Sequence, residues 1–229
     1  METPSYIVAS VNLRMVARLF AAFLVLACVS GFAQTDDLAV GRFLVASRDL
    51  GDPNFAKTVI LLVRYNEENG AVGLVVNRAT DVTISRAFQE LKEAKGRTDP
   101  VYFGGPVELN SVLALLRTGT KPENAVRVFG DVYLISNKDA LKAALASGVE
   151  ASVFHAYVGY AGWSAGQLQH EVELGAWYIM PADAATVFHS DPDSVWPRLI
   201  RRTETQVAGI PRIPRLPCIP SFICTPPLR

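Results

Sequence analysis

The pattern of apolar and polar residues predicts a series of short strands at the start of the folded region. The runs RFLVAS (42–47) and KTVILLV (57–63) are apolar and rich in β-branched residues, which is typical of buried strands. The residues GDPN (51–54) between them indicate a turn. The segment NEENG (66–70) reverses the chain before AVGLVVN (71–77), so the second and third runs are expected to form an antiparallel hairpin.

Three other segments have the spacing of helices. In TISRAFQEL (83–91) the apolar residues recur at i, i+3, i+4 and i+7, which predicts one buried helix face: Ile84, Ala87, Phe88 and Leu91. The segment NKDALKAALASG (137–148) predicts a helix with Asn137 as its N-cap and Gly148 as its end. The segment DPDSVWPRLIRR (191–202) predicts a last helix, with a proline near its start.

The remaining strands are interspersed with these helices without a regular alternation. VYFGGPV (101–107) breaks at its two glycines, and VRVFGDVYLIS (126–136) predicts two short strands around a Gly-Asp turn. SVFHAYVGY (152–160) and AWYIMP (176–181) also have the composition of strands. Frequent hairpins and irregular order favour an α+β fold over a doubly wound parallel sheet.

Composition indicates one globular domain of ordinary size. Of the 229 residues, 50% are hydrophobic and 19% charged, so a sizeable core can form. Lysine plus arginine equals aspartate plus glutamate, 22 of each, which gives no bulk argument for nucleic acid or acidic lipid as a partner. We expect the domain to cover residues 37–205.

The first residues have the order of an export signal. Arg14 and Arg18 precede the apolar run LFAAFLVLACVSGFA (19–33), and Gly31 and Ala33 place small side chains before a cleavage site. Residues 1–33 are therefore expected to be a signal peptide or an N-terminal anchor, which places the domain in the periplasm or outside the cell. The alternative is a cytoplasmic domain whose start is mis-assigned.

Residues 206–229 form a proline-rich tail. Prolines at short intervals exclude a helix or a central strand there, so an extended segment is expected. Cys218 and Cys224 lie in this tail and leave two alternatives, a small disulfide loop or two unpaired thiols.

The segment GWSAG (162–166) matches G-x-S-x-G, the turn that carries a serine nucleophile. It follows a predicted strand and precedes a helix, and Asp183 and His189 lie downstream in hydrolase order. A serine hydrolase using Ser164, His189 and Asp183 is therefore one hypothesis.

A structural role explains the same serine more simply. Ser164 and Gln167 form the S-x-x-Q pattern of a capping box at the start of a helix. The oxyanion loop that a hydrolase requires has no match, since Gly104-Gly105-Pro106 has lost a donor to proline. We therefore favour the capping interpretation, with no catalytic residue.

Other chemistry finds little support in the sequence. The three histidines, His155, His170 and His189, do not form a zinc motif, so no metal site is predicted. There is no G-x-G-x-x-G or Walker sequence, so no cofactor is expected. The basic group RLIRR (198–202) is interpreted as a solvated helix face rather than a DNA contact.

Four motifs in order and spacing resemble the YqgE/AlgH family of bacterial proteins. They are GRFLVASRDLGDPNFAKTVILLV, ENGAVGLVVNR, FGGPV and GYAGWSAGQL, and the likeness covers residues 41–202. The resemblance implies an α+β fold with a bifurcated mixed sheet curled into a pseudo-barrel and surrounded by helices. It also implies a transcriptional regulator, without an established activity or DNA site, and this is kept as an alternative function.

The sequence departs from the family pattern at several positions. The resemblance leads us to expect proline, histidine, proline, histidine and glutamate where this chain has Arg48, Tyr65, Ala79, Leu116 and Gln169. The positions suited to chemistry are thus the ones replaced. The predicted export is a further departure, because the family is normally cytoplasmic and an exported member could not act on transcription directly.

Glycine-rich turns supply the hypothesis that we favour from the sequence. Turns around Gly70, Gly104 and Gly159 can gather backbone donors into a concave site. The predicted ligand-binding residues are Gly104, Gly105, Tyr160, Trp163 and Gln167, although the two aromatic residues can equally be core anchors. The predicted function is a non-enzymatic domain that binds a protein partner or a small ligand, contacting the membrane only through its N-terminal segment.

Overall fold

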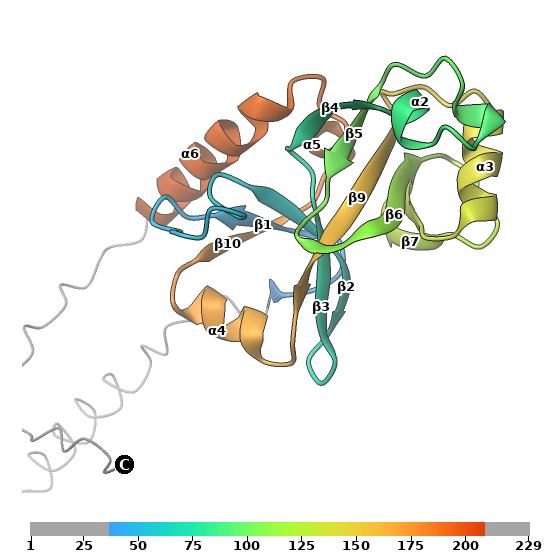
Figure 1. Cartoon of the computed structure of the whole chain (residues 1–229). Helices are drawn as coiled ribbons and strands as arrows, with labels where there is room; N and C mark the ends of the chain where they lie inside the picture. Colours follow the sequence, from blue (N-terminus) through green and yellow to red (C-terminus); the bar gives the residue numbers. More distant parts are fainter. Residues whose placement is uncertain (1–36, 209–229) are drawn as a thin grey trace, which may run out of the picture. The chain divides into compact units, whose positions relative to one another are not determined.

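The computed structural model describes residues 37–208, which form one α+β domain (Figure 1). Its strands are β1 (Arg42–Ala46), β2 (Val59–Asn66), β3 (Gly70–Val75), β4 (Ala79–Thr83), β5 (Pro100–Phe103), β6 (Val107–Arg117), β7 (Val126–Phe129), β8 (Val132–Ile135), β9 (Phe154–Trp163) and β10 (Trp177–Pro181). Its helices are α2 (Ile84–Ala87), α3 (Lys138–Ala146), α4 (Gln167–Glu173), α5 (Ala184–Val187) and α6 (Val195–Ala208), with short 3₁₀ turns η2 (Lys92–Ala94) and η3 (Pro192–Ser194).

All ten strands belong to one strongly curled sheet that forms a half-barrel. The main path runs β10-β1-β2-β3-β9-β6-β8-β7 and is antiparallel throughout. Strands β4 and β5 form a branch that joins β9 through a parallel pairing. The sheet is therefore mixed and bifurcated, which confirms the fold expected from the resemblance.

The bifurcation occurs along β9. One edge of this strand pairs with β5 over residues 156–158 and with β3 over residues 161–163, while the other edge pairs with β6. Two strands thus share one edge of β9 in succession, and β5 leaves the sheet where β3 begins to pair. Figure 1 shows β9 crossing the middle of the molecule between the two branches.

Glycines at this bifurcation allow the backbones to approach closely. A Cβ atom on Gly104 would lie 2.3 Å from the carbonyl oxygen of Gly159, and one on Gly105 would lie 2.3 Å from the amide nitrogen of Ala161. Gly159 also has a φ of +67°, which L side chains rarely adopt. The glycine-rich turns predicted from the sequence are therefore required by the strand packing itself.

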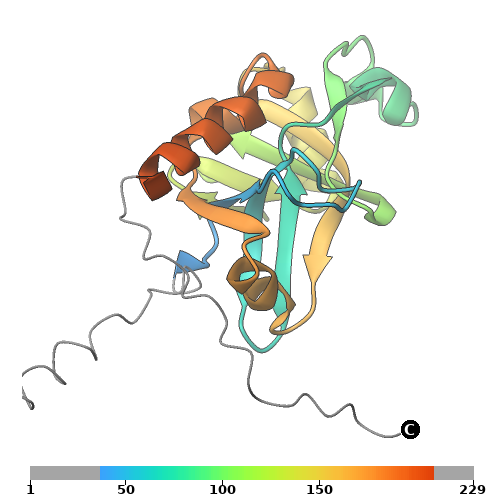
Figure 2. The same cartoon turned by 90° about the vertical axis from the view of Figure 1, so that its left-hand side faces the viewer.

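The helices cover the sheet and complete two apolar clusters. Helix α6 lies along the part of the sheet that contains β1 (Figure 2). Trp196 of this helix donates from its indole N–H to the carbonyl of Ala46 at 2.8 Å. Its buried residues recur at helical spacing and join the larger cluster: Val195, Trp196, Leu199 and Ile200. Helices α2 and α3 contribute buried residues to the smaller cluster, together with residues of β6 and β8.

Most of the predicted elements are present. The strands at the start of the domain, the hairpin and the helix capped by Asn137 are confirmed, and the Asn137 side chain accepts from the Ala140 amide at 2.8 Å. The basic residues predicted to lie on a solvated face, Arg198, Arg201 and Arg202, are exposed on α6.

Three predictions of local structure were wrong. The helix expected over residues 83–91 ends at Ala87, because Phe88 leaves the helical region with φ −121° and ψ 51°. Strands β4 and β6 were not predicted, although β6 is the longest strand. Helix α6 continues to Ala208, three residues into the predicted tail.

The predicted signal segment 1–33, its cleavage site before Gln34, and the cysteines at 218 and 224 lie outside the described residues. Within residues 37–208, no helix is long and apolar enough to cross a membrane.

Candidate functional site

Ser164 lies at the surface, just after the end of β9. Gln167 Oε1 accepts hydrogen bonds from both the backbone N–H and the hydroxyl of Ser164, each at 3.1 Å. Helix α4 begins at Gln167, however, and its N-cap is Gly166 with a φ of +75°. The glutamine half of the predicted capping box is therefore formed, but Ser164 itself is not the N-cap, because the left-handed glycine starts the helix two residues later.

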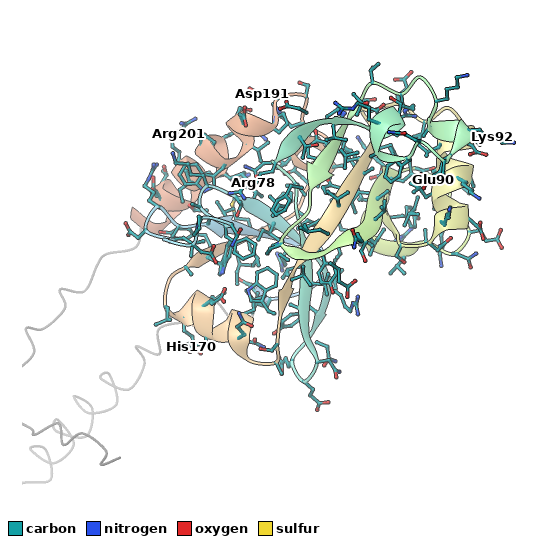
Figure 3. The ribbon with its side chains drawn as sticks, viewed as in Figure 1. Arg78, Glu90, Lys92, His170, Asp191 and Arg201 are labelled. Carbon is teal, nitrogen blue, oxygen red and sulfur yellow. The ribbon has the colours of Figure 1, made fainter. Side chains whose placement is uncertain are left out.

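The structure does not bring the hypothetical hydrolase residues together. Asp183 is the N-cap of α5, where it accepts from the backbone N–H and hydroxyl of Thr186. The Nδ1 atom of His189 interacts with the backbone of Asp191. His189 lies by the N-terminal end of β9 and Ser164 beyond the C-terminal end, and ten extended residues span about 30 Å. In Figure 3, Asp191 and His170 of α4 mark these two opposite ends of the molecule.

A shallow hollow over β3 and β9 contains several of the predicted ligand-binding residues. We call it the β3–β9 hollow; its volume is about 360 Å³, and its lining includes Arg64, Asn69, Gly70, Tyr160 and Trp163. Burial and the neighbouring Glu108 carboxylate raise the pKa of Tyr160. The structure thus places Tyr160 and Trp163 with Gly70 at one concave surface, whereas Gly104 and Gly105 lie at the strand bifurcation and not in its lining.

Trp163 and Gln167 also have a structural role. Glu171 Oε2 accepts from the indole N–H groups of Trp163 and Trp177, at 2.9 and 2.8 Å. Gln167 Nε2 donates to the other oxygen of the same carboxylate at 3.0 Å. Phe55 lies against both indole rings, with centroid separations of 6.2 and 5.9 Å. This arrangement fastens α4 to β9 and β10.

A second and larger cavity opens between β5, the start of β9 and the turn that follows α5. We call it the His155 pocket; its volume is about 380 Å³, within the range of small-molecule sites. Tyr102, His155 and Phe188 contribute rings to its lining, and Pro100 and Pro192 add apolar surface. Further polar residues line it as well: Asp99, Ser152, His189 and Ser190.

The rings of the His155 pocket are packed in a definite order. The His155 imidazole stacks on Tyr102 with a centroid separation of 4.2 Å and an interplanar angle of 20°. Phe188 lies 5.1 Å from the same imidazole at a tilt of 60°. His155 Nε2 is 3.4 Å from the Tyr102 hydroxyl, a long hydrogen bond. The imidazole is therefore held between two aromatic side chains from different elements.

Two polar atoms in this region are buried without a hydrogen-bond partner among residues 37–208. They are Nδ1 of His155 and the hydroxyl of Tyr157. Residues 155 and 157 are two apart on β9, so their side chains point to the same side of the sheet. Buried polar atoms in native proteins are nearly always paired, which makes these two groups unusual among residues 37–208.

Burial controls the protonation of these groups. Desolvation lowers the pKa of His155 to about 4, and the Asp99 carboxylate opposes this effect only in part. Desolvation likewise raises the pKa of Tyr102 and, more strongly, that of Tyr157. At neutral pH these three groups are therefore a neutral imidazole and two neutral phenols.

Sequence reasoning did not identify the His155 pocket. His155 was considered only as a metal ligand, and within the described residues no group of three or more histidine, cysteine, aspartate or glutamate side chains could hold a metal ion. The available signal was a histidine and a tyrosine at alternate positions of an otherwise apolar strand. Their partner Tyr102 comes from β5, which pairs with β9 over a long sequence separation.

Two positions that depart from the family pattern are adjacent in space. Gln169 Nε2 donates to the Tyr65 hydroxyl at 3.0 Å, so a neutral pair stands where the resemblance leads us to expect histidine and glutamate. Arg48 instead forms a two-point ion pair with Glu204 and lies over the Trp196 ring at 5.6 Å. Ala79 lines the His155 pocket, where a small side chain leaves space.

Comparison with known proteins agrees with the resemblance. A family model for AlgH-like proteins matches residues 43–208. A UPF0301 protein of Chlorobaculum tepidum is 34% identical over 181 residues, which cover 79% of this chain and 95% of that protein. A UPF0301 protein of Azoarcus is 37% identical over 156 residues, covering 66% of this chain and 82% of that protein.

Two solved structures have a similar fold. The solution structure of the AlgH protein from Pseudomonas aeruginosa has a TM-score of 0.60 and 29% identity, covering 79% of this chain and 95% of that one. The crystal structure of protein DIP2367 from Corynebacterium diphtheriae has a TM-score of 0.61 and 26% identity, covering 72% and 87% of the two chains.

Proposed function

We propose that this chain, which belongs to the AlgH-like family, is a non-enzymatic domain that binds a small ligand in the His155 pocket beside its bifurcated sheet. The family is uncharacterised, so the proposal rests on the geometry of this chain. It keeps the class of function expected from the sequence and moves the site to residues that sequence reasoning did not select.

One observation carries the proposal. A cavity of about 380 Å³ is lined by the imidazole of His155, the rings of Tyr102 and Phe188 and a few hydrogen-bonding side chains. Concave sites with mostly apolar walls, a few polar groups and a perturbed pKa are typical of ligand pockets. The stacked Tyr102 and the tilted Phe188 hold that imidazole in place, which makes the site preorganised.

The β3–β9 hollow supports the sequence prediction less strongly. Trp163 is nearly covered, and its indole N–H is already bound to Glu171. Contact of Tyr160, Trp163 and Gln167 with a ligand therefore stays a prediction.

Ligand-observed NMR with a library of small fragments tests the proposed site on the full chain. Ser152 is exposed at the pocket, and a tryptophan there, Ser152→Trp, is expected to block entry and abolish binding of the fragments that the wild type binds. Ala165→Trp makes the same change at an exposed position by α4 and is the matched control. Fragments that bind both variants equally, or a wild type that binds none, would contradict the proposal.

The proposed site of action is outside the cytoplasm, as the order of residues in segment 1–33 predicts. There the regulatory role implied by the family label would act through the bound ligand or a protein partner rather than through DNA. Determining the N-terminus of the protein isolated from its own cells tests this part. A chain that begins near Gln34 supports export, and an intact Met1 in the soluble cytoplasmic fraction contradicts it.

A further inference from the structure

The charges around the His155 pocket are already compensated. Asp99 is the acidic residue in its lining, and Arg97 engages both of its carboxylate oxygens at 2.8 and 2.6 Å. Both side chains are largely covered, with 16% and 12% of their surface exposed. Arg97 also donates to the Val149 carbonyl and lies over the Phe154 ring at 5.7 Å. Its guanidinium is therefore committed and does not line the pocket.

The remaining polar groups of the pocket can form hydrogen bonds without a formal charge. They are the imidazoles of His155 and His189, the hydroxyl of Tyr102 and the serine hydroxyls at positions 152 and 190. A charged ligand would lose its hydration on entry and find no uncompensated charge of opposite sign, which is strongly unfavourable. An uncharged ligand with a donor or acceptor group loses much less hydration free energy on entry.

The lining of the His155 pocket favours a ligand that contains an aromatic ring. His155 lies in contact with both Tyr102 and Phe188, and two prolines and an alanine, Ala79, add apolar surface to the lining. Aromatic rings attract one another in offset and edge-to-face arrangements beyond the effect of area alone. A flat ring would therefore use more of this surface than a flexible chain of equal size.

We infer that the His155 pocket selects an uncharged, ring-bearing small molecule with a hydrogen-bonding substituent and discriminates against its carboxylate and ammonium analogues. This inference rests on the proposed function and specifies its class of ligand. The discrimination depends on the Arg97–Asp99 pair, which removes both possible sources of charge attraction at the pocket.

Three probes of similar size, each with one benzene ring, test the inference on the full chain: benzamide, benzoate and benzylamine. Their affinities are measured by ligand-observed NMR at neutral pH, with Ser152→Trp as the variant that defines pocket binding. Benzamide is expected to bind at least tenfold more tightly than either charged probe. Benzoate or benzylamine binding in the pocket as tightly as benzamide would overturn the inference and leave the proposed function intact.

A charge change at the pair provides a second, independent measurement. Asp99→Asn leaves the Arg97 guanidinium without its counter-charge beside the pocket. The affinity for benzoate is therefore expected to increase at least tenfold relative to the affinity for benzamide. Asp131→Asn frees Arg117 from a similar ion pair at 2.9 Å elsewhere on the surface and is expected to leave the ratio unchanged. An unchanged ratio in Asp99→Asn overturns the inference; if this variant does not fold, the wild-type ratio decides.

The failure of the proposed function has a different signature. If none of the three probes, and no fragment of the library, shows binding that Ser152→Trp removes, then the pocket is not a ligand site, and the inference fails with it. Binding by charged probes alone contradicts only the class of ligand.

Discussion

Acid is expected to destabilise this domain through His155 well before its carboxylates titrate. The folded protein holds the imidazole neutral, with a pKa of about 4, whereas the unfolded chain has the ordinary value of 6.5. Between these values the unfolded state binds more protons than the folded state. The contribution of His155 to the free energy of unfolding is therefore largest above pH 6.5, and it decreases as the pH falls toward 4.

The magnitude follows from the size of the shift. Each unit of pKa difference is worth about 1.4 kcal/mol, so the fall from 6.5 to about 4 removes about 3 kcal/mol from the stability. This is a large share of the stability of an ordinary domain, which is about 5–15 kcal/mol. Asp131 and Glu204, whose pKa values are lowered by hydrogen bonds from Arg117 and Arg48, begin to contribute only near or below their ordinary values of 3.8 and 4.5.

Urea denaturation at several pH values between about 5 and 7 isolates the contribution of the imidazole, because linkage gives the slope of stability against pH directly. The variant His155→Gln cannot titrate in this range and is expected to flatten the slope. His170→Gln makes the same substitution at an imidazole that is 70% exposed on α4, and it is the matched control.

Equal slopes for the wild type and His155→Gln would refute the argument. Should His155→Gln fail to fold, the NMR signal of the His155 ring provides the second measurement. It is expected to show no titration while the protein remains folded above about pH 5, and a midpoint near 6.5 would contradict the buried neutral state.

Three substitutions test the structural interpretation elsewhere. Gly104→Ala is expected to destabilise the domain by about 1–3 kcal/mol, because the new Cβ would lie 2.3 Å from a carbonyl oxygen. Gly119→Ala, with open space around it, is the control. Equal urea midpoints for the two variants would contradict the packing at the bifurcation. Glu171→Gln removes the charge that accepts from two indole N–H groups and is expected to lose about 1.5–3 kcal/mol, with a change in tryptophan fluorescence. Glu173→Gln, 58% exposed, is expected to change neither quantity, and a similar loss in both variants would argue against the specific role. Ser164→Ala is expected to lose at most about 1 kcal/mol, and a fluorophosphonate probe is expected to label neither form; labelling that this substitution abolishes would restore the nucleophile.

Local sequence patterns were sufficient to predict most of the individual strands and helices. The alternation of apolar runs and turn residues predicted β1, β2 and β3, and the Asn137 cap and Gly148 placed α3 within a residue at each end. These features depend on neighbours a few positions away, which a sequence displays directly. The resemblance added the bifurcated sheet, which no local pattern contains.

Tertiary packing decided the local structure in segments where the sequence signals were weak or conflicting. The segment 83–91 has a helical apolar period, but only one turn forms, because the chain must bring β4 alongside β5 and bury Phe88 and Leu91 beneath it. Gly166 rather than Ser164 caps α4, in a left-handed conformation that glycine adopts without strain.

The sequence by itself determined the fold class, most of the succession of strands and helices, and the glycines that the bifurcation needs. Only the tertiary structure decided which polar residues share a site. The His155 pocket draws its lining from Ala79, β5, the start of β9 and the turn at residues 188–192, and these segments meet only because β9 pairs with strands from distant parts of the chain. Local periodicity carries no information about such pairings, because the free energy that selects them comes from burial and hydrogen bonding across the whole sheet.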